Sequence, residues 1–143
     1  MNYHLVFLII FMFLFTAPAS GGERLDGRYQ TTVKDVIDGD TFSARIKVWL
    51  GQEIETLVRI NGIDTAELRS TCPHEKALAQ DAKARVTQII AGKTVTLSNI
   101  TYGKYAGRIV ADVDTDEAGS VANILINAKL ARLYHGKQRT AWC

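Results

Sequence analysis

The feature that most constrains the fold is a series of three segments in which apolar and polar residues alternate. They cover residues 28–36, 40–50 and 53–61 and are rich in valine, isoleucine, threonine and aromatic residues. Successive side chains of a strand point to opposite faces, so this pattern predicts strands with one buried face. Asp-Gly at residues 38–39 and Gly-Gln at residues 51–52 are turn sequences. The three segments therefore predict an antiparallel meander.

The rest of the chain predicts two helices and two more strands. The expected elements are a helix over 74–91, strands over about 93–100 and 107–113, and a helix over 121–130. Residues 62–73 are expected to be a loop, Pro73 suits the first turn of a helix, Gly92 ends that helix, and Ser120 is a candidate N-cap. This order predicts a mainly β (α+β) fold. It is a five-stranded Greek-key barrel of the oligonucleotide/oligosaccharide-binding (OB) type, with one helix after strand three and another near the C-terminus.

The N-terminus carries an apolar run over residues 5–15, followed by small residues in an A-x-A pattern. The run is shorter than the roughly 20 residues that a membrane-spanning helix needs, and the small residues are typical of a signal-peptide cleavage site. We therefore predict a signal peptide over 1–19, a polar linker over 20–27 and one domain over 28–143. The protein would be secreted or periplasmic. A retained membrane anchor is the alternative.

The chain contains two cysteines, Cys72 and Cys143. In an exported protein an even number of cysteines predicts a disulfide. The chain-entropy model gives closure of a loop of about 70 residues a stabilisation of roughly 4 kcal/mol. Neither cysteine has the neighbouring Cys or His spacing of a zinc site.

Charged residues lie at the turns of the predicted meander. Asp38 and Asp40 flank the first turn, Arg59 ends the third strand, and Asp64 and Glu67 follow in the loop. The first turn and the end of the third strand lie at the same edge of a meander, so Asp40, Asp64 and Glu67 could converge. Like charges repel unless a cation lies between them, and carboxylate oxygens suit Ca²⁺ or Mg²⁺.

Two arginines are expected near the same edge. Arg59 and Arg108, which begins the fifth strand, would supply bidentate donors for a phosphate. A hard cation would polarise a phosphoryl oxygen, the guanidiniums would stabilise the transition-state charge, and a carboxylate would accept a proton from water. The set therefore indicates phosphodiester chemistry. The formal net charge of +2 permits nucleic-acid binding without requiring it.

Three motifs in this order resemble the thermonuclease (staphylococcal nuclease-like) family. They are Ile37-Asp-Gly-Asp-Thr41, Arg59 with Ile63-Asp-Thr-Ala-Glu67, and Lys104-Tyr-Ala-Gly-Arg108. The resemblance covers roughly residues 30–135. It implies an OB-fold barrel and Ca²⁺-dependent cleavage of DNA and RNA, mainly single-stranded or breathing duplex. Cleavage on the 5′-oxygen side would leave 3′-phosphates.

The resemblance also implies a role for each matched residue. The implied roles are metal binding by Asp40, Asp64 and the Thr65 carbonyl, water activation or positioning by Glu67, phosphate binding by Arg59 and Arg108, and contact with a terminal phosphate by Lys104 and Tyr105. Asp38 is expected to support the turn rather than to bind metal.

The sequence departs from the family pattern in several places. Ala66 replaces a usual proline, and Tyr-Ala-Gly-Arg is one residue longer than the common Tyr-Gly-Arg, which leaves the register of Arg108 open. Tyr134 lies near the position of a second pocket tyrosine but is shifted. Trp142 and the Cys72–Cys143 disulfide are expected to close the barrel in place of the family's long C-terminal helix.

The alternatives to a nuclease are a non-catalytic OB module that binds nucleic acid or protein, and a phosphodiesterase with another substrate. The complete set Arg59, Asp64, Glu67 and Arg108 favours the enzyme, because a pure binder need not keep it. A monomer without stable membrane association after leader cleavage is expected.

Overall fold

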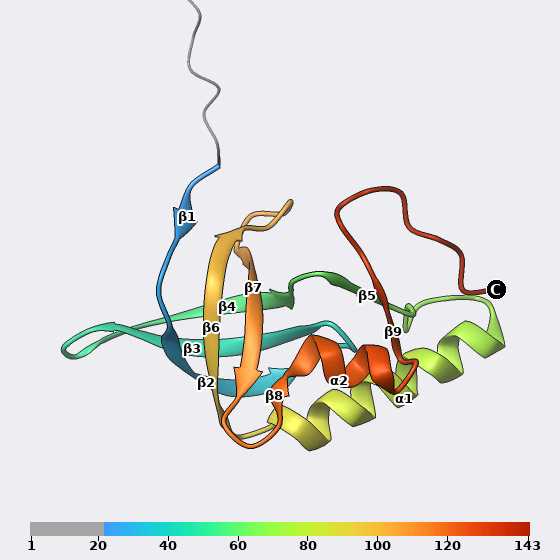
Figure 1. Cartoon of the computed structure of the whole chain (residues 1–143), viewed down its shortest axis with the longest axis horizontal. Helices are drawn as coiled ribbons and strands as arrows, with labels where there is room; N and C mark the ends of the chain where they lie inside the picture. Colours follow the sequence, from blue (N-terminus) through green and yellow to red (C-terminus); the bar gives the residue numbers. More distant parts are fainter. Residues whose placement is uncertain (1–21) are drawn as a thin grey trace, which may run out of the picture.

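A closed five-stranded barrel is the centre of the fold in the computed structural model, which describes residues 22–143 (Figure 1). The elements are β1 (Arg24–Leu25), β2 (Tyr29–Val36), β3 (Thr41–Trp49), β4 (Gln52–Ile60), β5 (Ile63–Thr65), α1 (Pro73–Ile90), β6 (Thr94–Tyr102), β7 (Arg108–Thr115), β8 (Gly119–Ser120), α2 (Val121–Asn127) and β9 (Ala131–Leu133). The predicted signal peptide, residues 1–19, lies outside the described residues. Among residues 22–143, no helix has the length and apolar character needed to cross a membrane.

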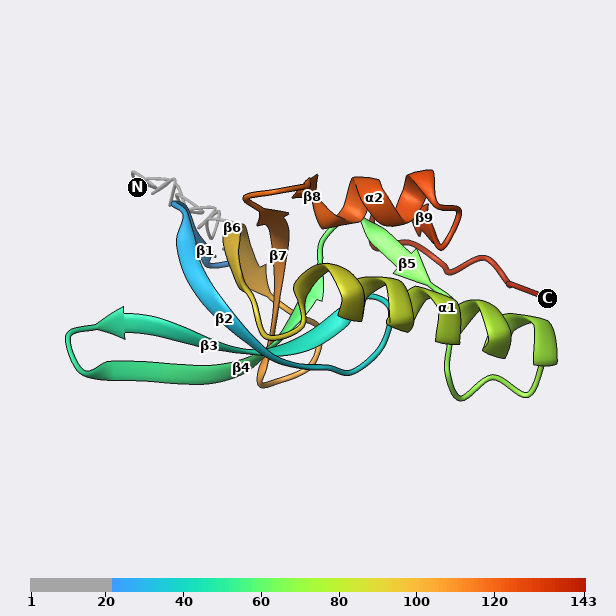
Figure 2. The same ribbon diagram turned by 90° about the horizontal axis from the view of Figure 1, so that it is seen from below.

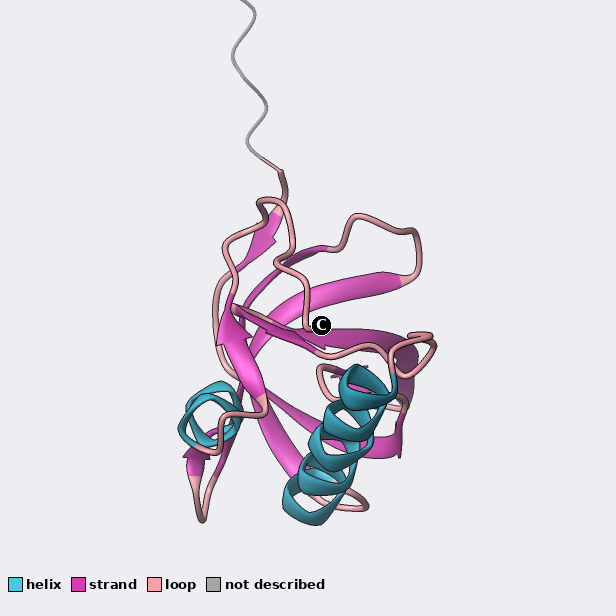
Figure 3. Cartoon of the chain, turned by 90° about the vertical axis from the view of Figure 1, so that its right-hand side faces the viewer, coloured by secondary structure: helices cyan, strands magenta, loops and turns pink. Residues whose placement is uncertain are grey.

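The barrel closes because β6 and β7, which lie near opposite ends of the strand order, pair with each other. The large sheet has the order β1-β6-β2-β3-β4-β7-β8, and β6 also pairs with β7. The β4–β7 pairing is parallel and the other pairings of the closed barrel are antiparallel. The predicted fold class is confirmed, because β2, β3, β4, β6 and β7 form the OB barrel, with α1 after the third barrel strand and α2 near the C-terminus (Figure 3).

The core explains why the alternating sequence folds in this way. Phe42, Val58 and Leu97 from three barrel strands are fully buried, and Ile90 of α1 and Leu125 of α2 pack into the same cluster. Burial of one such side chain contributes about 1.5–3 kcal/mol relative to exposure. Figure 2 shows both helices at one end of the molecule and the β3–β4 hairpin projecting at the other.

The ends of the helices lie close to the predicted positions. Pro73 is the first residue of α1, and Gly92, with φ of 67°, follows its end. The hydroxyl of Ser120 accepts a hydrogen bond from the backbone N–H of Asn123 at 3.3 Å, which confirms the predicted N-cap of α2. The second helix ends at Asn127, whereas the sequence predicts that it continues to residue 130.

Two of the short strands lie in segments for which the sequence predicts a loop or a linker. Ile63–Thr65, in the predicted loop, form β5 and pair antiparallel with β9, with Asp64 opposite Arg132. Arg24–Leu25, in the predicted linker, pair with β6. Strands of two or three residues are too short to show alternation, so the pattern does not reveal them. The β5–β9 pairing brings the C-terminal part of the chain beside the acidic loop.

The predicted disulfide is present. Cys72 and Cys143 are bonded, with their Cα atoms 6.6 Å apart and a sequence separation of 71. Cys72 is the N-cap residue of α1, so the bond attaches the last residue to the start of that helix. Figure 1 shows the C-terminal segment running from β9 back toward this point.

Candidate functional site

A cavity of about 840 Å³ lies at the edge of the barrel. Its walls come from the β2–β3 turn, the end of β4, the loop after β5, the β6–β7 turn and the segment after β9. Of the residues predicted for the site, the cavity is lined by Asp40, Arg59, Thr65, Glu67, Lys104, Tyr105 and Arg108. Asp64 is predicted for the site but does not line the cavity. The structure thus brings together residues from separate parts of the chain.

The β2–β3 turn positions Asp40 by close packing. The carboxylate of Asp38 accepts a hydrogen bond from the backbone N–H of Asp40 at 3.0 Å, which shapes the turn as expected. A Cβ on Gly39 would lie 2.7 Å from the Cβ of Ala82 and 2.9 Å from the hydroxyl oxygen of Thr65. Only glycine therefore allows the turn to lie so close to α1 and β5.

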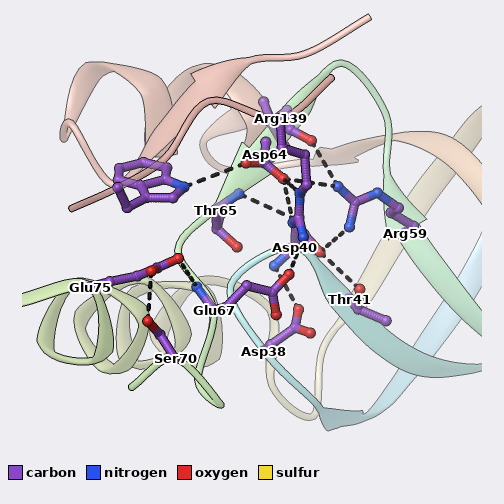
Figure 4. Close-up of polar contacts among 12 residues, drawn as sticks. Asp38, Asp40, Thr41, Arg59, Asp64, Thr65, Glu67, Ser70, Glu75 and Arg139 are labelled. Atoms are coloured by element: carbon purple, nitrogen blue, oxygen red, sulfur yellow. Dashed lines mark hydrogen bonds and ion pairs between the residues drawn. The ribbon is translucent and has the colours of Figure 1, made fainter. Parts of the chain in front are cut away.

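Asp40 forms a buried ion pair with Arg59 (Figure 4). Arg59 Nη1 donates to Asp40 Oδ1 at 2.6 Å, and the two side chains are only 17% and 3% exposed. Thr41 Oγ1 donates to the same oxygen at 2.9 Å, and the Thr65 backbone N–H donates to Oδ2 at 3.3 Å. Burial raises the pKa of Asp40 above its ordinary value, although the Arg59 guanidinium acts in the opposite direction. This charge is therefore costly to bury, and these donor contacts compensate for part of the cost.

Asp64 lies between two arginines and is 7% exposed. Its Oδ1 lies 3.5 Å from Arg59 Nη2 and accepts a hydrogen bond from Arg139 Nε at 2.5 Å. Its Oδ2 accepts one from the Trp142 indole N–H at 3.4 Å. Because Arg59 contacts both Asp40 and Asp64, these two carboxylates lie near one another, as the sequence predicts.

Glu67 is more accessible, with 51% of its side chain exposed at the cavity. Its backbone N–H donates to Glu75 Oε1 at 3.3 Å, and Glu75 Oε2 accepts from the Ser70 hydroxyl at 2.7 Å. These bonds fix the loop against the first turn of α1. The carboxylate itself contacts Arg139 Nη1 (Figure 4).

The sequence reasoning missed Arg139. This residue lies in the segment after β9, lines the cavity and bridges Asp64 and Glu67. Burial alone would lower its pKa, but the hydrogen bonds to Glu67 and Asp64 outweigh that effect and raise it. The predicted disulfide was an available signal. It holds Cys143 beside the start of α1, so a cation four residues earlier could reach the acidic loop just before that helix.

Tyr105 lines the cavity and lies beside two cationic side chains. The Arg108 guanidinium carbon is 5.0 Å and the Lys104 Nζ is 5.8 Å from the centre of its ring. Such contacts hold long cationic side chains in place. Arg108 begins β7 and pairs with Leu57 of β4. Its Nε is buried, with no hydrogen-bond acceptor among the described residues.

The turn before Arg108 depends on a glycine. The Gly103 N–H donates to the Arg108 carbonyl at 2.8 Å, and a Cβ on Gly103 would lie 2.6 Å from that oxygen. A side chain at this position would therefore push the arginine away. Tyr134, which the sequence places near the position of a second pocket tyrosine, also lines the cavity, with the Arg59 guanidinium carbon 6.0 Å from its ring centre.

The oxygen donors at this site suit a hard cation. The carboxylates of Asp40 and Asp64 offer only oxygen, and both lie near the Arg59 guanidinium. The backbone carbonyl of Thr65, which follows Asp64 in β5, is a further oxygen donor. A cationic guanidinium already binds Asp64 and Glu67, which shows that the site attracts positive charge. Within residues 22–143, however, no three His, Cys, Asp or Glu side chains are close enough together to hold a metal ion. The three carboxylates predicted to converge therefore contact two different arginines. Arg59 contacts Asp40 and Asp64, and Arg139 contacts Asp64 and Glu67.

Comparison with known proteins identifies one family. The family model described as "Staphylococcal nuclease homologue" matches residues 57–141, which is more than half of the chain. The match includes Arg59, the acidic loop, Arg108 and Arg139. No curated protein matches the chain.

Proposed function

The chain belongs to the staphylococcal nuclease homologue family, and on this premise we propose that it is an exported, Ca²⁺-dependent nuclease that hydrolyses DNA and RNA to 3′-phosphate ends. One observation carries the proposal. Two arginines and an accessible carboxylate, Arg59, Arg108 and Glu67, line one cavity together with Asp40. A module that only bound nucleic acid would need the arginines but would not need a carboxylate beside them, since a carboxylate repels phosphate.

Asp40, Asp64 and the Thr65 carbonyl would hold the Ca²⁺. When bound, the ion would supply polarisation of a phosphoryl oxygen. The oxygen donors of these three residues match the preference of a hard cation. Burial of Asp40 and Asp64 strengthens their attraction for positive charge, because nearby water screens it less.

The protein groups perform the remaining chemistry. Arg59 and Arg108 would bind the non-bridging phosphate oxygens and stabilise the charge of the pentacoordinate transition state. Water attacks phosphorus, Glu67 accepts a proton from that water, and the bond from phosphorus to the 5′ oxygen breaks. A solvent proton then neutralises the 5′ oxygen. The products are a 3′-phosphate and a 5′-hydroxyl.

Lys104 and Tyr105 would contact the next phosphate and its nucleotide. Both line the cavity beside Arg108. Aromatic rings stack on bases without strong sequence preference, and lysine attracts phosphate as a point charge. Single strands, whose bases are free to stack, are therefore the expected substrates. Binding should weaken as salt rises, because phosphate contacts release counterions.

The Cys72–Cys143 bond supports export, because disulfides persist in oxidising compartments. N-terminal sequencing of the protein recovered outside the cytoplasm of a bacterial host tests this part. A chain that begins near residue 20 is expected. A chain that retains residues 1–19 in the membrane fraction would contradict cleavage of the predicted signal.

A cleavage assay tests the activity. Purified protein is incubated with single-stranded DNA in Ca²⁺, in Mg²⁺ and in excess chelator. We expect cleavage in Ca²⁺, none in chelator, and a rate at least about 100-fold lower for Glu67→Gln, because a general base contributes about 10²–10⁴-fold. Glu53→Gln is the matched control, because Glu53 pairs with Arg45 on the distant hairpin. Salt-sensitive DNA binding without cleavage would indicate the binding module instead.

A further inference from the structure

Arg139 forms ion pairs with two of the carboxylates that the proposed reaction needs. Its Nε donates to Asp64 Oδ1 at 2.5 Å, and its Nη1 contacts Glu67. The first residue is an expected cation ligand and the second is the expected acceptor of a proton from water. The same guanidinium therefore contacts both the expected cation ligand and the expected proton acceptor (Figure 4).

The chain holds this arginine from both sides. Before it, β9 pairs with β5, and after it the disulfide fixes Cys143 to the start of α1. Arg132 of β9 also contacts the end of this segment. Its guanidinium carbon lies 3.7 Å from the centre of the Trp142 ring, and its Nη1 donates to the Ala141 carbonyl at 3.0 Å. The position of Arg139 thus follows from the path of a tethered segment.

A guanidinium and a divalent cation compete for the same oxygens. Asp64 does not line the cavity, whereas Arg139 does, and the Trp142 indole N–H lies on the second oxygen of Asp64. A cation that enters from the cavity must therefore displace Arg139 before it contacts Asp64. Displacement would also release Glu67 to interact with water.

We propose that Arg139 is an internal cation that occupies Asp64 and Glu67 in the ion-free protein, and that a divalent cation must displace it to form the competent site. The residue thereby sets the cation concentration at which the enzyme works, and the Cys72–Cys143 tether keeps it in place. This proposal rests on the proposed function for the role of Asp64. It assigns to Arg139 a positioning role rather than a catalytic one.

The charge arrangement explains why such a residue is useful. Without a cation, Asp40, Asp64 and Glu67 place three negative charges at one edge of the barrel, and Arg59 alone neutralises one of them. Arg139 supplies a second positive charge that needs no ion from solution. Arg139 therefore reduces the repulsion among these carboxylates in the ion-free protein.

Calcium titration by calorimetry tests the proposal without measuring activity. CaCl₂ is titrated into the oxidised wild-type protein, into Arg139→Gln and into Arg69→Gln. Arg69 is the matched control, because it is exposed, lies two residues from Glu67 and forms no ion pair within the described part of the chain. Both variants lose one positive charge, so a general electrostatic effect would appear equally in both.

We expect Arg139→Gln to bind Ca²⁺ at least about tenfold more tightly than wild type, which corresponds to about 1.4 kcal/mol, and Arg69→Gln to remain within about twofold of wild type. Equal affinity of wild type and Arg139→Gln would overturn the proposal. So would an equal gain in both variants, or an absence of saturable Ca²⁺ binding in all three proteins.

A second variant tests the tether. Cys143→Ser leaves the guanidinium in the chain but removes the covalent link, so Ca²⁺ affinity should increase by about threefold, which is less than for Arg139→Gln. The wild-type protein treated with reductant should match it. An affinity unchanged from the oxidised wild type would contradict the role of the disulfide.

The outcome is separable from that of the proposed function. Tighter Ca²⁺ binding by Arg139→Gln in a protein that does not cleave DNA would support the competition and refute the nuclease. Ca²⁺-dependent cleavage with an unchanged affinity in Arg139→Gln would refute the competition and leave the nuclease proposal standing.

Discussion

Two arginines contact carboxylates at the same edge of the barrel, but the chain builds the two contacts differently. Arg59 and Asp40 come from the barrel and its first turn, and their side chains are almost fully buried. Arg139 comes from the segment after the last strand, and 41% of its side chain is exposed. The first contact is inseparable from the folded barrel, whereas the second depends on a tether. The comparison indicates that the Arg59–Asp40 pair is fixed, whereas the contacts of Arg139 can be exchanged for contacts with a cation.

The largest expected effect comes from breaking the fixed pair. Arg59→Ala would leave the Asp40 carboxylate buried and unpaired, which typically costs about 3–5 kcal/mol. Urea denaturation followed by circular dichroism would measure the lower free energy of unfolding. Arg45→Ala, on the exposed hairpin, removes ion pairs with Glu53 and Glu55 and should cost no more than about 1 kcal/mol. A loss below about 1 kcal/mol for Arg59→Ala would show that the pair is not part of the fold.

The tether gives the next effect. A Cys72→Ser/Cys143→Ser protein should lose about 2–4 kcal/mol of stability, because the disulfide constrains the unfolded chain. Reductant should lower the urea midpoint of the wild type to that of the double variant and leave the variant unchanged. Equal midpoints for the oxidised wild type and the variant would mean that the tether holds the segment without stabilising the molecule.

The difference between the two regions also explains what the sequence could predict. Asp40 and Arg59 lie on strands and a turn whose alternation and Asp-Gly signal are local, so their meeting at one edge followed from the meander. Glu67 and Arg108 followed in the same way, from the ends of predicted strands. The five barrel strands and both helices were predicted for the same reason.

Arg139 could not be predicted from a local pattern. Its position depends on the β5–β9 pairing of two three-residue strands and on a covalent bond to Cys72. Neither strand is long enough to show periodicity, and both contacts join residues far apart in sequence. The disulfide was predicted, but it places the residues before Cys143 only when the path of the chain from β9 is also known.

A smaller effect should follow from a change in the turn that carries Asp40. Gly39→Ala would place a methyl group against Ala82 and Thr65, so overpacking should cost about 1–3 kcal/mol. Thermal unfolding would measure this, with Gly22→Ala as the control because no atom lies within 4 Å of its added Cβ. The control should remain within about 0.5 kcal/mol. Equal melting temperatures for both variants would contradict the close packing of the turn.

The smallest expected effect is on the exchangeable pair. In chelator, Arg139→Gln should lower the free energy of unfolding by only about 1 kcal/mol, because the guanidinium is partly exposed. Addition of Ca²⁺ should raise the melting temperature of this variant more than that of the wild type, because ligand binding to the native state stabilises it according to affinity. A smaller Ca²⁺-dependent shift in the variant would argue against exchange.

A crystal structure of Glu67→Gln with Ca²⁺ and a short single-stranded oligonucleotide tests the central claim most directly. We expect a phosphate between Arg59 and Arg108, calcium bound by Asp40 and Asp64, Arg59 still in contact with Asp40, and Arg139 withdrawn from Asp64. An oligonucleotide bound outside the cavity, with Arg139 still on Asp64 and no ion beside Asp40, would contradict the account.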